Sequence, residues 1–298
     1  MVNKILAVVG IGIVVAGLLV LVIFGMKNLG NSIDTKPTDA LIKDGKLDEA
    51  RASIDQIAEK NPDAKSIGKM YFTLAGSYES KNDMVKARDI YQLILKKYQN
   101  VENISEVQDK AGKLNIAILF SKAITNKDAL YEVEPGDTLI NIAKKFGTTV
   151  DLIKIANSLN SENIRAGAKL KISKAKYKIL VDKSQNILTL LSDNDIVKVY
   201  RISTGENNCT PAGNFKIVNK IIDPAWYTEK AIVPAESPDN VLGSRWMGFN
   251  LAGYGIHGTT SPGKIGQQAT KGCVRMINTE VEELYKIIPI GTEVTIVD

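Results

Sequence analysis

The spacing of apolar residues changes along this chain, and that change most constrains how the chain can fold. Between about residues 38 and 124 apolar side chains recur every three to four residues, as in helices that bury one face. From Tyr177 onward they alternate, as in half-buried strands. Five segments alternate in this way: 177–182, 187–191, 196–202, 213–218 and 293–297. The 298 residues are therefore expected to form separate helical and mostly-β domains.

The helical region contains two related segments. Ala50 and Arg51 are repeated as Ala87 and Arg88, 37 residues later, and Pro62 interrupts the pattern between them. A third helix over roughly 104–122 would cover the open end. The segment 38–124 weakly resembles tetratricopeptide repeats, without their signature tryptophan and first tyrosine. Two such units form either a groove that docks a protein partner or a packed stalk that spaces the next domain.

The N-terminus carries an uncharged apolar run over residues 5–26, between Lys4 and Lys27. Its length suits a bilayer-spanning helix, and it exceeds the usual apolar core of a signal peptide. No small-residue cleavage site and no cysteine follow it. We therefore expect an uncleaved transmembrane signal anchor over 5–26. Flanking charges barely favour a cytoplasmic N-terminus, so they do not decide the orientation.

Composition excludes several classes of function. The formal charge of +5 is spread along the chain without a long basic block, so nucleic-acid binding is not expected. The two cysteines are too few for a disulfide framework, and with a single histidine they do not form a structural zinc motif. We expect no metal site and no cofactor.

A short segment between the two large regions has its own pattern. A strand runs into the turn Pro135-Gly136, and the apolar spacing that follows predicts two helices and a returning strand. Asp137 is expected to cap the first helix, Gly147 to end it, and Thr149 to cap the second. The result is a βααβ unit.

This unit resembles a LysM domain over residues 129–173, chiefly through its Pro-Gly-Asp-Thr-Leu run. The resemblance implies binding to glycans that contain N-acetylglucosamine. Ala166 replaces the proline common in the family before the following glycine. The alternative is a small folded spacer that binds no ligand.

The chemistry is expected in the C-terminal region, where His257, the sole histidine, precedes Cys273 by sixteen residues. A nucleophilic thiol needs a base, and imidazole suits that task near neutral pH. His257 could act as that base or stabilise the thiolate as imidazolium. Cys209 is the other thiol; it lacks the glycine and arginine context of Cys273 and is treated as a bystander. A regulatory disulfide between the two cysteines is the alternative.

Two neighbours of Cys273 suggest further roles. Gly272 gives the backbone freedom to place amides as an oxyanion hole. Arg275 would lie on the same side of an extended chain as Cys273 and supply positive potential or hold a substrate carboxylate. The alternatives are a structural salt bridge for Arg275 and, for the whole set, a buried thiol with an unrelated surface imidazole.

Residues 177–298 resemble the L,D-transpeptidase (YkuD-like) catalytic domain. The motifs that carry the resemblance are Ser203-Thr204-Gly205, Thr210-Pro211-Ala212-Gly213, Ile256-His257-Gly258-Thr259, Ile265-Gly266 and Gly272-Cys273-Val274-Arg275-Met276. The family implies a β-sandwich-like domain with a flap, here roughly 223–248. One helix is expected, over 279–288, capped by Asn278 or Thr279. Thr270 stands where the family usually has serine, and its hydroxyl can make the same hydrogen bond.

The resemblance also implies an activity. The cysteine attacks the bond between the diamino acid and D-alanine of a peptidoglycan stem tetrapeptide, and an amine of another stem resolves the thioester. Such enzymes are targets of carbapenems. We therefore expect a cell-wall cross-linking enzyme of the bacterial envelope, with its C-terminal bulk outside the cytoplasm. The rivals are an L,D-carboxypeptidase, in which water resolves the thioester, and an inactive peptidoglycan-binding scaffold.

Overall fold

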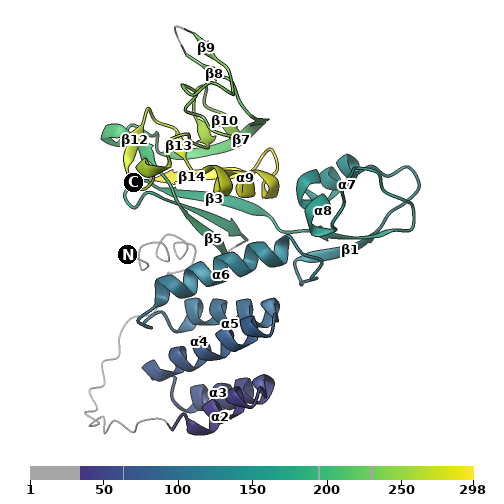
Figure 1. The fold of residues 1–298 in the computed structure, drawn as a ribbon, viewed down its shortest axis with the longest axis vertical. Helices are drawn as coiled ribbons and strands as arrows, with labels where there is room; N and C mark the ends of the chain where they lie inside the picture. The colour runs from purple at the N-terminus through teal and green to yellow at the C-terminus, as the bar shows by residue number, and fades with distance from the viewer. Residues whose placement is uncertain (1–33, 63, 194, 229–230) are drawn as a thin grey trace, which may run out of the picture.

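The protein is described from a computed structural model, which covers residues 34–62, 64–193, 195–228 and 231–298. Figure 1 shows a column of helices below, a mostly-β domain above and a small domain at its side. The helical region, the βααβ unit and the mostly-β domain expected from sequence are all present.

None of the helices in the described ranges is long and apolar enough to span a bilayer. The expected anchor over 5–26 lies outside those ranges.

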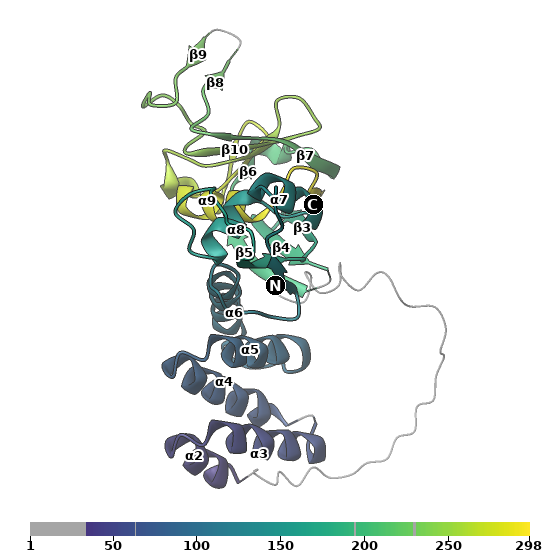
Figure 2. The same ribbon diagram turned by 90° about the vertical axis from the view of Figure 1, so that its right-hand side faces the viewer.

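The helical region is built from five helices that stack on one another (Figure 2). They are α2 (Lys36–Lys43), α3 (Leu47–Lys60), α4 (Lys65–Ser80), α5 (Met84–Lys97) and α6 (Ile104–Leu119). One apolar core runs through them, with Ile54, Leu74 and Tyr91 fully buried. Helix α6, the covering helix expected over roughly 104–122, ends at Leu119, because the chain then turns toward the small domain. The tetratricopeptide resemblance itself stays a prediction.

The small domain has the expected βααβ order. Its elements are β1 (Asp128–Glu132), α7 (Leu139–Phe146), α8 (Val150–Ala156) and β2 (Lys169–Ser173). The two strands are antiparallel. Gly147 ends α7 with a left-handed backbone, and Thr149 caps α8.

One capping prediction in this domain is wrong. Thr138, and not Asp137, accepts a hydrogen bond from the first turn of α7, from Asn141 N. The Asp137 carboxylate instead accepts bonds from Tyr131 Oη and Glu134 N, so it closes the turn that precedes the helix.

The catalytic domain is built on an eight-stranded sheet with the order β13-β11-β10-β7-β14-β3-β4-β5. The strands are β3 (Tyr177–Asp182), β4 (Ile187–Ser192), β5 (Asp195–Arg201), β7 (Gly213–Ile222), β10 (Arg245–Phe249), β11 (Gly255–His257), β13 (Val274–Arg275) and β14 (Glu293–Val297). Two short pairs lie beside it: β6 (Thr204–Gly205) with β12 (Gln268–Thr270), and β8 (Trp226–Tyr227) with β9 (Ile232–Val233).

The long strand β7 joins the two halves of this sheet. Its first residues pair with β14, and the residues from Ile217 onward pair with β10. The expected sandwich is therefore one continuous sheet whose halves share a strand. Helix α9 (Asn278–Ile287) packs Val281 and Leu284 into the same core as the strands.

The predicted cap of α9 is also wrong. The N-cap position is Ile277, and no side chain makes a capping bond there. Asn278 lies inside the first turn of the helix, and its side chain bonds to two loops instead.

The small domain is fixed to both of its neighbours. Lys171 on β2 is buried, and its ammonium donates to the carbonyl oxygens of Ile118 and Ser121 at 2.8 and 2.9 Å, at the end of α6. Asp128 lies 3.8 Å from the same nitrogen. On the other side, the Thr149 hydroxyl donates to the carbonyl of Lys286 in α9.

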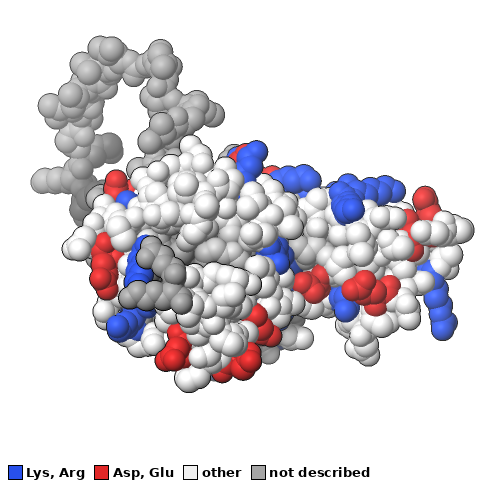
Figure 3. All heavy atoms as spheres, turned by 90° about the horizontal axis from the view of Figure 1, so that it is seen from above, with Lys and Arg blue, Asp and Glu red and all other residues white. Residues whose placement is uncertain are grey.

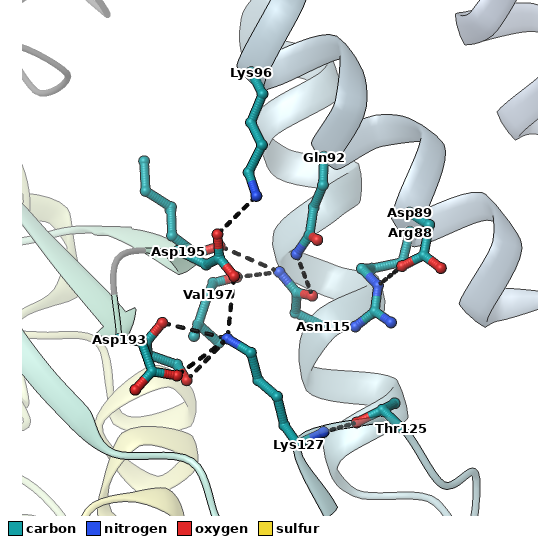
Figure 4. A network of polar contacts seen from close by, with 12 residues as sticks. Arg88, Asp89, Gln92, Lys96, Asn115, Thr125, Lys127, Asp193, Asp195 and Val197 are labelled. Atoms are coloured by element: carbon teal, nitrogen blue, oxygen red, sulfur yellow. Dashed lines mark hydrogen bonds and ion pairs between the residues drawn. The ribbon is translucent and has the colours of Figure 1, made fainter. Parts of the chain in front are cut away.

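The helical region covers the free edge of the catalytic sheet. Asn115 on α6 donates to the carbonyl oxygen of Val197 on β5 at 2.8 Å. Lys96 and Lys127 both form ion pairs with Asp195 (Figure 4). A polar cavity of about 280 Å³ lies at this three-domain junction, away from the predicted nucleophile. Because α6 supplies partners for an exposed strand edge, the helical region acts in part as a buttress.

We predict that Lys171→Met loosens the junction. The substitution removes the bonds to α6 and leaves the buried Asp128 carboxylate without its cation, which typically costs about 3 kcal/mol. The midpoint of urea unfolding should shift to a lower urea concentration. Trypsin should cut faster at Lys122 and Lys127. The matched control is Lys169→Met, at an exposed position of the same strand. Equal behaviour of the two variants would contradict this role of Lys171.

Candidate active site

Two adjacent strands bring the predicted site residues together. Strands β11 and β13 pair in parallel, with His257 opposite Arg275. Their neighbours Ile256 and Val274 also pair, and both are fully buried in the core. Side chains alternate between the faces of a strand, so His257 and Arg275 emerge on the other face. Cys273 immediately precedes β13, and the Arg275 charge is close enough to act on the pKa values of both His257 and Cys273.

The His257 ring is buried and held by a backbone carbonyl. Its Nδ1 lies 2.7 Å from the carbonyl oxygen of Gly258. A carbonyl can only accept, so Nδ1 carries the proton in the neutral ring and Nε2 carries the lone pair. Desolvation and the nearby Arg275 charge lower the His257 pKa from 6.5 to about 4, opposed in part by the Gly258 and Leu242 carbonyls. The ring is therefore neutral at physiological pH.

The Cys273 thiol is partly buried and donates to the carbonyl oxygen of Gly253 at 3.4 Å. Burial raises the thiol pKa, while the Gly255 amide and the Arg275 charge act in the opposite direction. At neutral pH the resting site thus holds a protonated thiol beside a neutral imidazole. Of the two roles considered for His257, this state favours general base over preformed imidazolium.

Thr270 and Gly272 shape the turn that carries the thiol. The Thr270 hydroxyl donates to the carbonyl oxygen of Cys273 at 2.7 Å and accepts from Gly272 N at 3.2 Å. Gly272 has φ +116°, and a Cβ placed on it would lie 2.7 Å from the Tyr254 ring. The position is therefore closed to other residues for two reasons, backbone strain and a side-chain clash.

Arg275 forms no salt bridge with any described residue, and its Nε is buried without a hydrogen-bond partner. Burial lowers the pKa of the guanidinium, and charge on Cys273 and Glu206 opposes that effect. The proposed structural ion pair is thus not formed within the described ranges. An unpaired guanidinium near the thiol suits an incoming carboxylate or carbonyl oxygen.

Cys209 lies closer to the catalytic turn than its sequence context suggests. It is exposed, and its Sγ is 4.0 Å from the carbonyl oxygen of Thr270. A Cβ on Gly205 would meet Cys209 Sγ at 2.4 Å and Gly272 Cα at 3.0 Å. Both cysteines are free thiols. The Ser203-Thr204-Gly205 segment therefore packs directly under the turn.

Sequence reasoning missed an aromatic residue in the site. Trp246 on β10 pairs with His257 on one side and Ile221 on the other, so the three share a row across the sheet. The Trp246 and His257 rings stack with centroids 6.2 Å apart. The indole Nε1 donates to Asn219 at 3.1 Å. Only the register of β10 against β11 reveals this arrangement.

Two glycines make room for that indole. A Cβ on Gly248 would lie 2.8 Å from Trp246 Nε1, and one on Gly255 would lie 2.9 Å from its ring. Trp246 therefore lies over bare backbone, with its indole stacked on the ring of His257.

The flap expected over 223–248 contains the β8–β9 hairpin, which extends from the sheet (Figure 1). Tyr227 and Ile232 on it, and Ile221 and Ile222 at the end of β7, are exposed apolar side chains. Figure 3 views this end of the molecule; the larger lobe carries a broad uncharged surface, and charged side chains lie around its margin and on the smaller lobe. Such a surface suits a partner with apolar or neutral polar groups.

Comparison with known proteins identifies two of the domains. Residues 176–296 match the model of the L,D-transpeptidase catalytic domain, and residues 131–173 match that of the LysM domain. A putative L,D-transpeptidase YkuD of Bacillus licheniformis is 35% identical over 175 residues, which cover 56% of this chain and 98% of that protein. The chain belongs to the L,D-transpeptidase family.

Two Bacillus subtilis proteins are similarly related. Putative L,D-transpeptidase YkuD is 34% identical over 56% of this chain and 97% of its own length. Putative L,D-transpeptidase YqjB is 40% identical over 40% of this chain and 70% of its own length. Both YkuD relatives are matched almost entirely by little more than half of this chain, which therefore carries additional sequence.

We predict that His257 makes folding stability depend on pH. Its folded pKa of about 4 lies below the ordinary 6.5, so the unfolded chain binds the extra proton between these values. This stabilising contribution is complete above about pH 6.5 and is lost as pH falls toward 4, by up to about 3 kcal/mol. The free energy of unfolding, measured by urea at several pH values from 4 to 7, should rise less steeply with pH for His257→Gln than for wild type. Cys209→Ala, which keeps the ring, is the control; identical slopes for wild type and His257→Gln would contradict the prediction.

Proposed function

We propose that this protein is a peptidoglycan L,D-transpeptidase in which Cys273 is the nucleophile. One observation carries the proposal: the parallel pairing of β11 and β13 sets the sole histidine opposite Arg275, an arginine without an ion-pair partner among the described residues that follows Cys273 by two positions. Membership of the L,D-transpeptidase family supports the same reaction class.

In the proposed first step, His257 Nε2 takes the thiol proton as Cys273 Sγ attacks the carbonyl carbon between the diamino acid and D-alanine. The tetrahedral intermediate collapses, the C–N bond breaks, and His257 returns the proton to the departing D-alanine amine. A thioester remains. An amine of a second stem then attacks it, His257 accepts the amine proton, and the thiol is restored.

Backbone amides and Arg275 are proposed to stabilise the negative charge that develops on the carbonyl oxygen. The Gly272 amide donates to Thr270 in the resting structure, so it would have to exchange partners to serve as an oxyanion donor. Arg275 is proposed to hold a carboxylate of the stem, because its guanidinium has no ion-pair partner among the described side chains.

The other domains are proposed to place this chemistry on the cell wall. The LysM domain would bind glycan strands, and the apolar run at 5–26 would anchor the chain in the membrane, with the bulk in the envelope outside the cytoplasm. The face of the helical region that does not cover β5 leaves room for a protein partner. An L,D-carboxypeptidase would share the acylation step and differ only in the group that resolves the thioester.

We predict that Cys273→Ala abolishes acylation and that Cys209→Ala does not. The reason is that Cys273 directly precedes the strand that pairs with His257, whereas Cys209 lies in a separate turn after β6. The measurement is the intact mass of the full chain after incubation with a carbapenem, which adds one adduct to a competent thiol. Incubation with a stem tetrapeptide then separates the activities, since a cross-linked dimer indicates transpeptidation and a released tripeptide indicates hydrolysis. Loss of the adduct in both variants would overturn the assignment.

We predict that the LysM domain binds the glycan of peptidoglycan. A fragment spanning 129–173 should sediment with insoluble peptidoglycan, and deleting this segment should lower binding of the whole protein to sacculi while carbapenem acylation continues. Binding is expected because the loops 134–138 and 158–168 stay largely exposed although the domain is docked on two sides. If the fragment is folded by circular dichroism and stays in the supernatant, the domain is a spacer.

A further inference from the structure

Asn278 has a polar contact that its place in α9 does not explain. An asparagine at the start of a helix usually bonds to the helix's own amides. Here Oδ1 accepts from Thr259 N at 2.9 Å and from Ser244 N at 3.3 Å, two loops outside the helix. The side chain therefore ties α9 to the segment that immediately follows His257.

The space for this amide is made by two glycines. A Cβ on Gly258 would lie 2.2 Å from Asn278 Oδ1, and one on Gly243 would lie 2.3 Å from the same atom. Gly243 also has φ +64°, a left-handed conformation that side chains disfavour. Both glycines are thus needed for Oδ1 to reach the backbone.

The peptide bond between Gly258 and Thr259 links Asn278 to the histidine. Its carbonyl oxygen accepts from His257 Nδ1 at 2.7 Å, and its N–H donates to Asn278 Oδ1 at 2.9 Å. A trans peptide is planar, and its C=O and N–H point in opposite directions. Fixing the N–H on Asn278 therefore aims the carbonyl at the imidazole.

We propose that Asn278 is a positioning residue that holds His257 in the Nδ1–H tautomer through this peptide plane. The inference rests on the proposed function, in which Nε2 must be free to take the thiol proton. Without Oδ1, the plane loses its second anchor and can rotate. The carbonyl then leaves Nδ1, and the ring can carry its proton on Nε2, where it cannot act as base.

The single histidine allows a direct test. The full chain, with its histidine ring labelled with ¹⁵N, is studied at rest by long-range ¹H–¹⁵N correlation, which distinguishes the two tautomers. Wild type should be in the Nδ1–H form. Asn278→Ala should show the Nε2–H form and lower the rate of Cys273 alkylation by iodoacetamide at pH 7, in a Cys209→Ala background, by about tenfold.

Two further variants separate positioning from folding. Asn278→Asp keeps an acceptor oxygen of the same reach, so it should restore the Nδ1–H form while its charge shifts the ring titration upward. Asn157→Ala removes an asparagine that likewise bonds backbone groups, in the LysM domain, and should leave tautomer and alkylation unchanged. If Asn278→Ala does not fold, Asn278→Ser, with its shorter hydroxyl, should give a mixture of tautomers.

An unchanged tautomer in a folded Asn278→Ala or Asn278→Ser variant would overturn the proposal, as would an Asn278→Asp variant that behaves like alanine. The tautomer is read without substrate. A wild-type chain that is in the Nδ1–H form but takes no carbapenem adduct would therefore contradict the proposed function and not the positioning role of Asn278.

Discussion

The parallel pairing of β11 with β13 is the constraint on which the site depends. Burial of Ile256 and Val274 fixes the register of this pair, because a slip of one residue would expose both core side chains. The same register sets His257 and Arg275 side by side on the opposite face. Sixteen residues separate His257 from Cys273 in sequence, and this pairing brings Val274 and Arg275, which follow Cys273, alongside β11.

Burial also determines the chemical state of the pair. Desolvation disfavours imidazolium and thiolate alike, so both groups rest neutral. Arg275 moves the two pKa values in the same direction, since its charge repels a proton on the ring and stabilises the thiolate. At neutral pH the thiol is therefore protonated and the imidazole is neutral. Trp246, stacked on the ring, contributes to this desolvation.

The three domains are joined by buried polar contacts as well as by the chain. Lys171 links β2 to the end of α6, and Asn115 links α6 to the edge of the catalytic sheet. Buried polar groups require partners with specific geometry, so they hold domains in one relative position better than apolar contacts do. A glycan bound to the LysM domain would thus have a fixed orientation with respect to the catalytic face.

Sequence by itself determined the domain order and the element types, and it proposed the reactive pair. Periodicity identified helices and strands because each element buries one face, and the pair stood out because the chain has one histidine. Capping of α7 and α9 was predicted wrongly, since Asp137 and Asn278 make their bonds outside the helix that follows or contains them. Such choices depend on which donors the fold brings near.

Only the tertiary structure decided the environment of the pair. The stacking of Trp246, the unpaired Arg275 and the contact of Asn278 with the Gly258–Thr259 peptide all join segments far apart in sequence. No local pattern encodes them, because strand register and loop packing are set by the whole core. The sequence suggests which thiol and which base to propose, whereas their protonation, orientation and exposure to water arise from the fold.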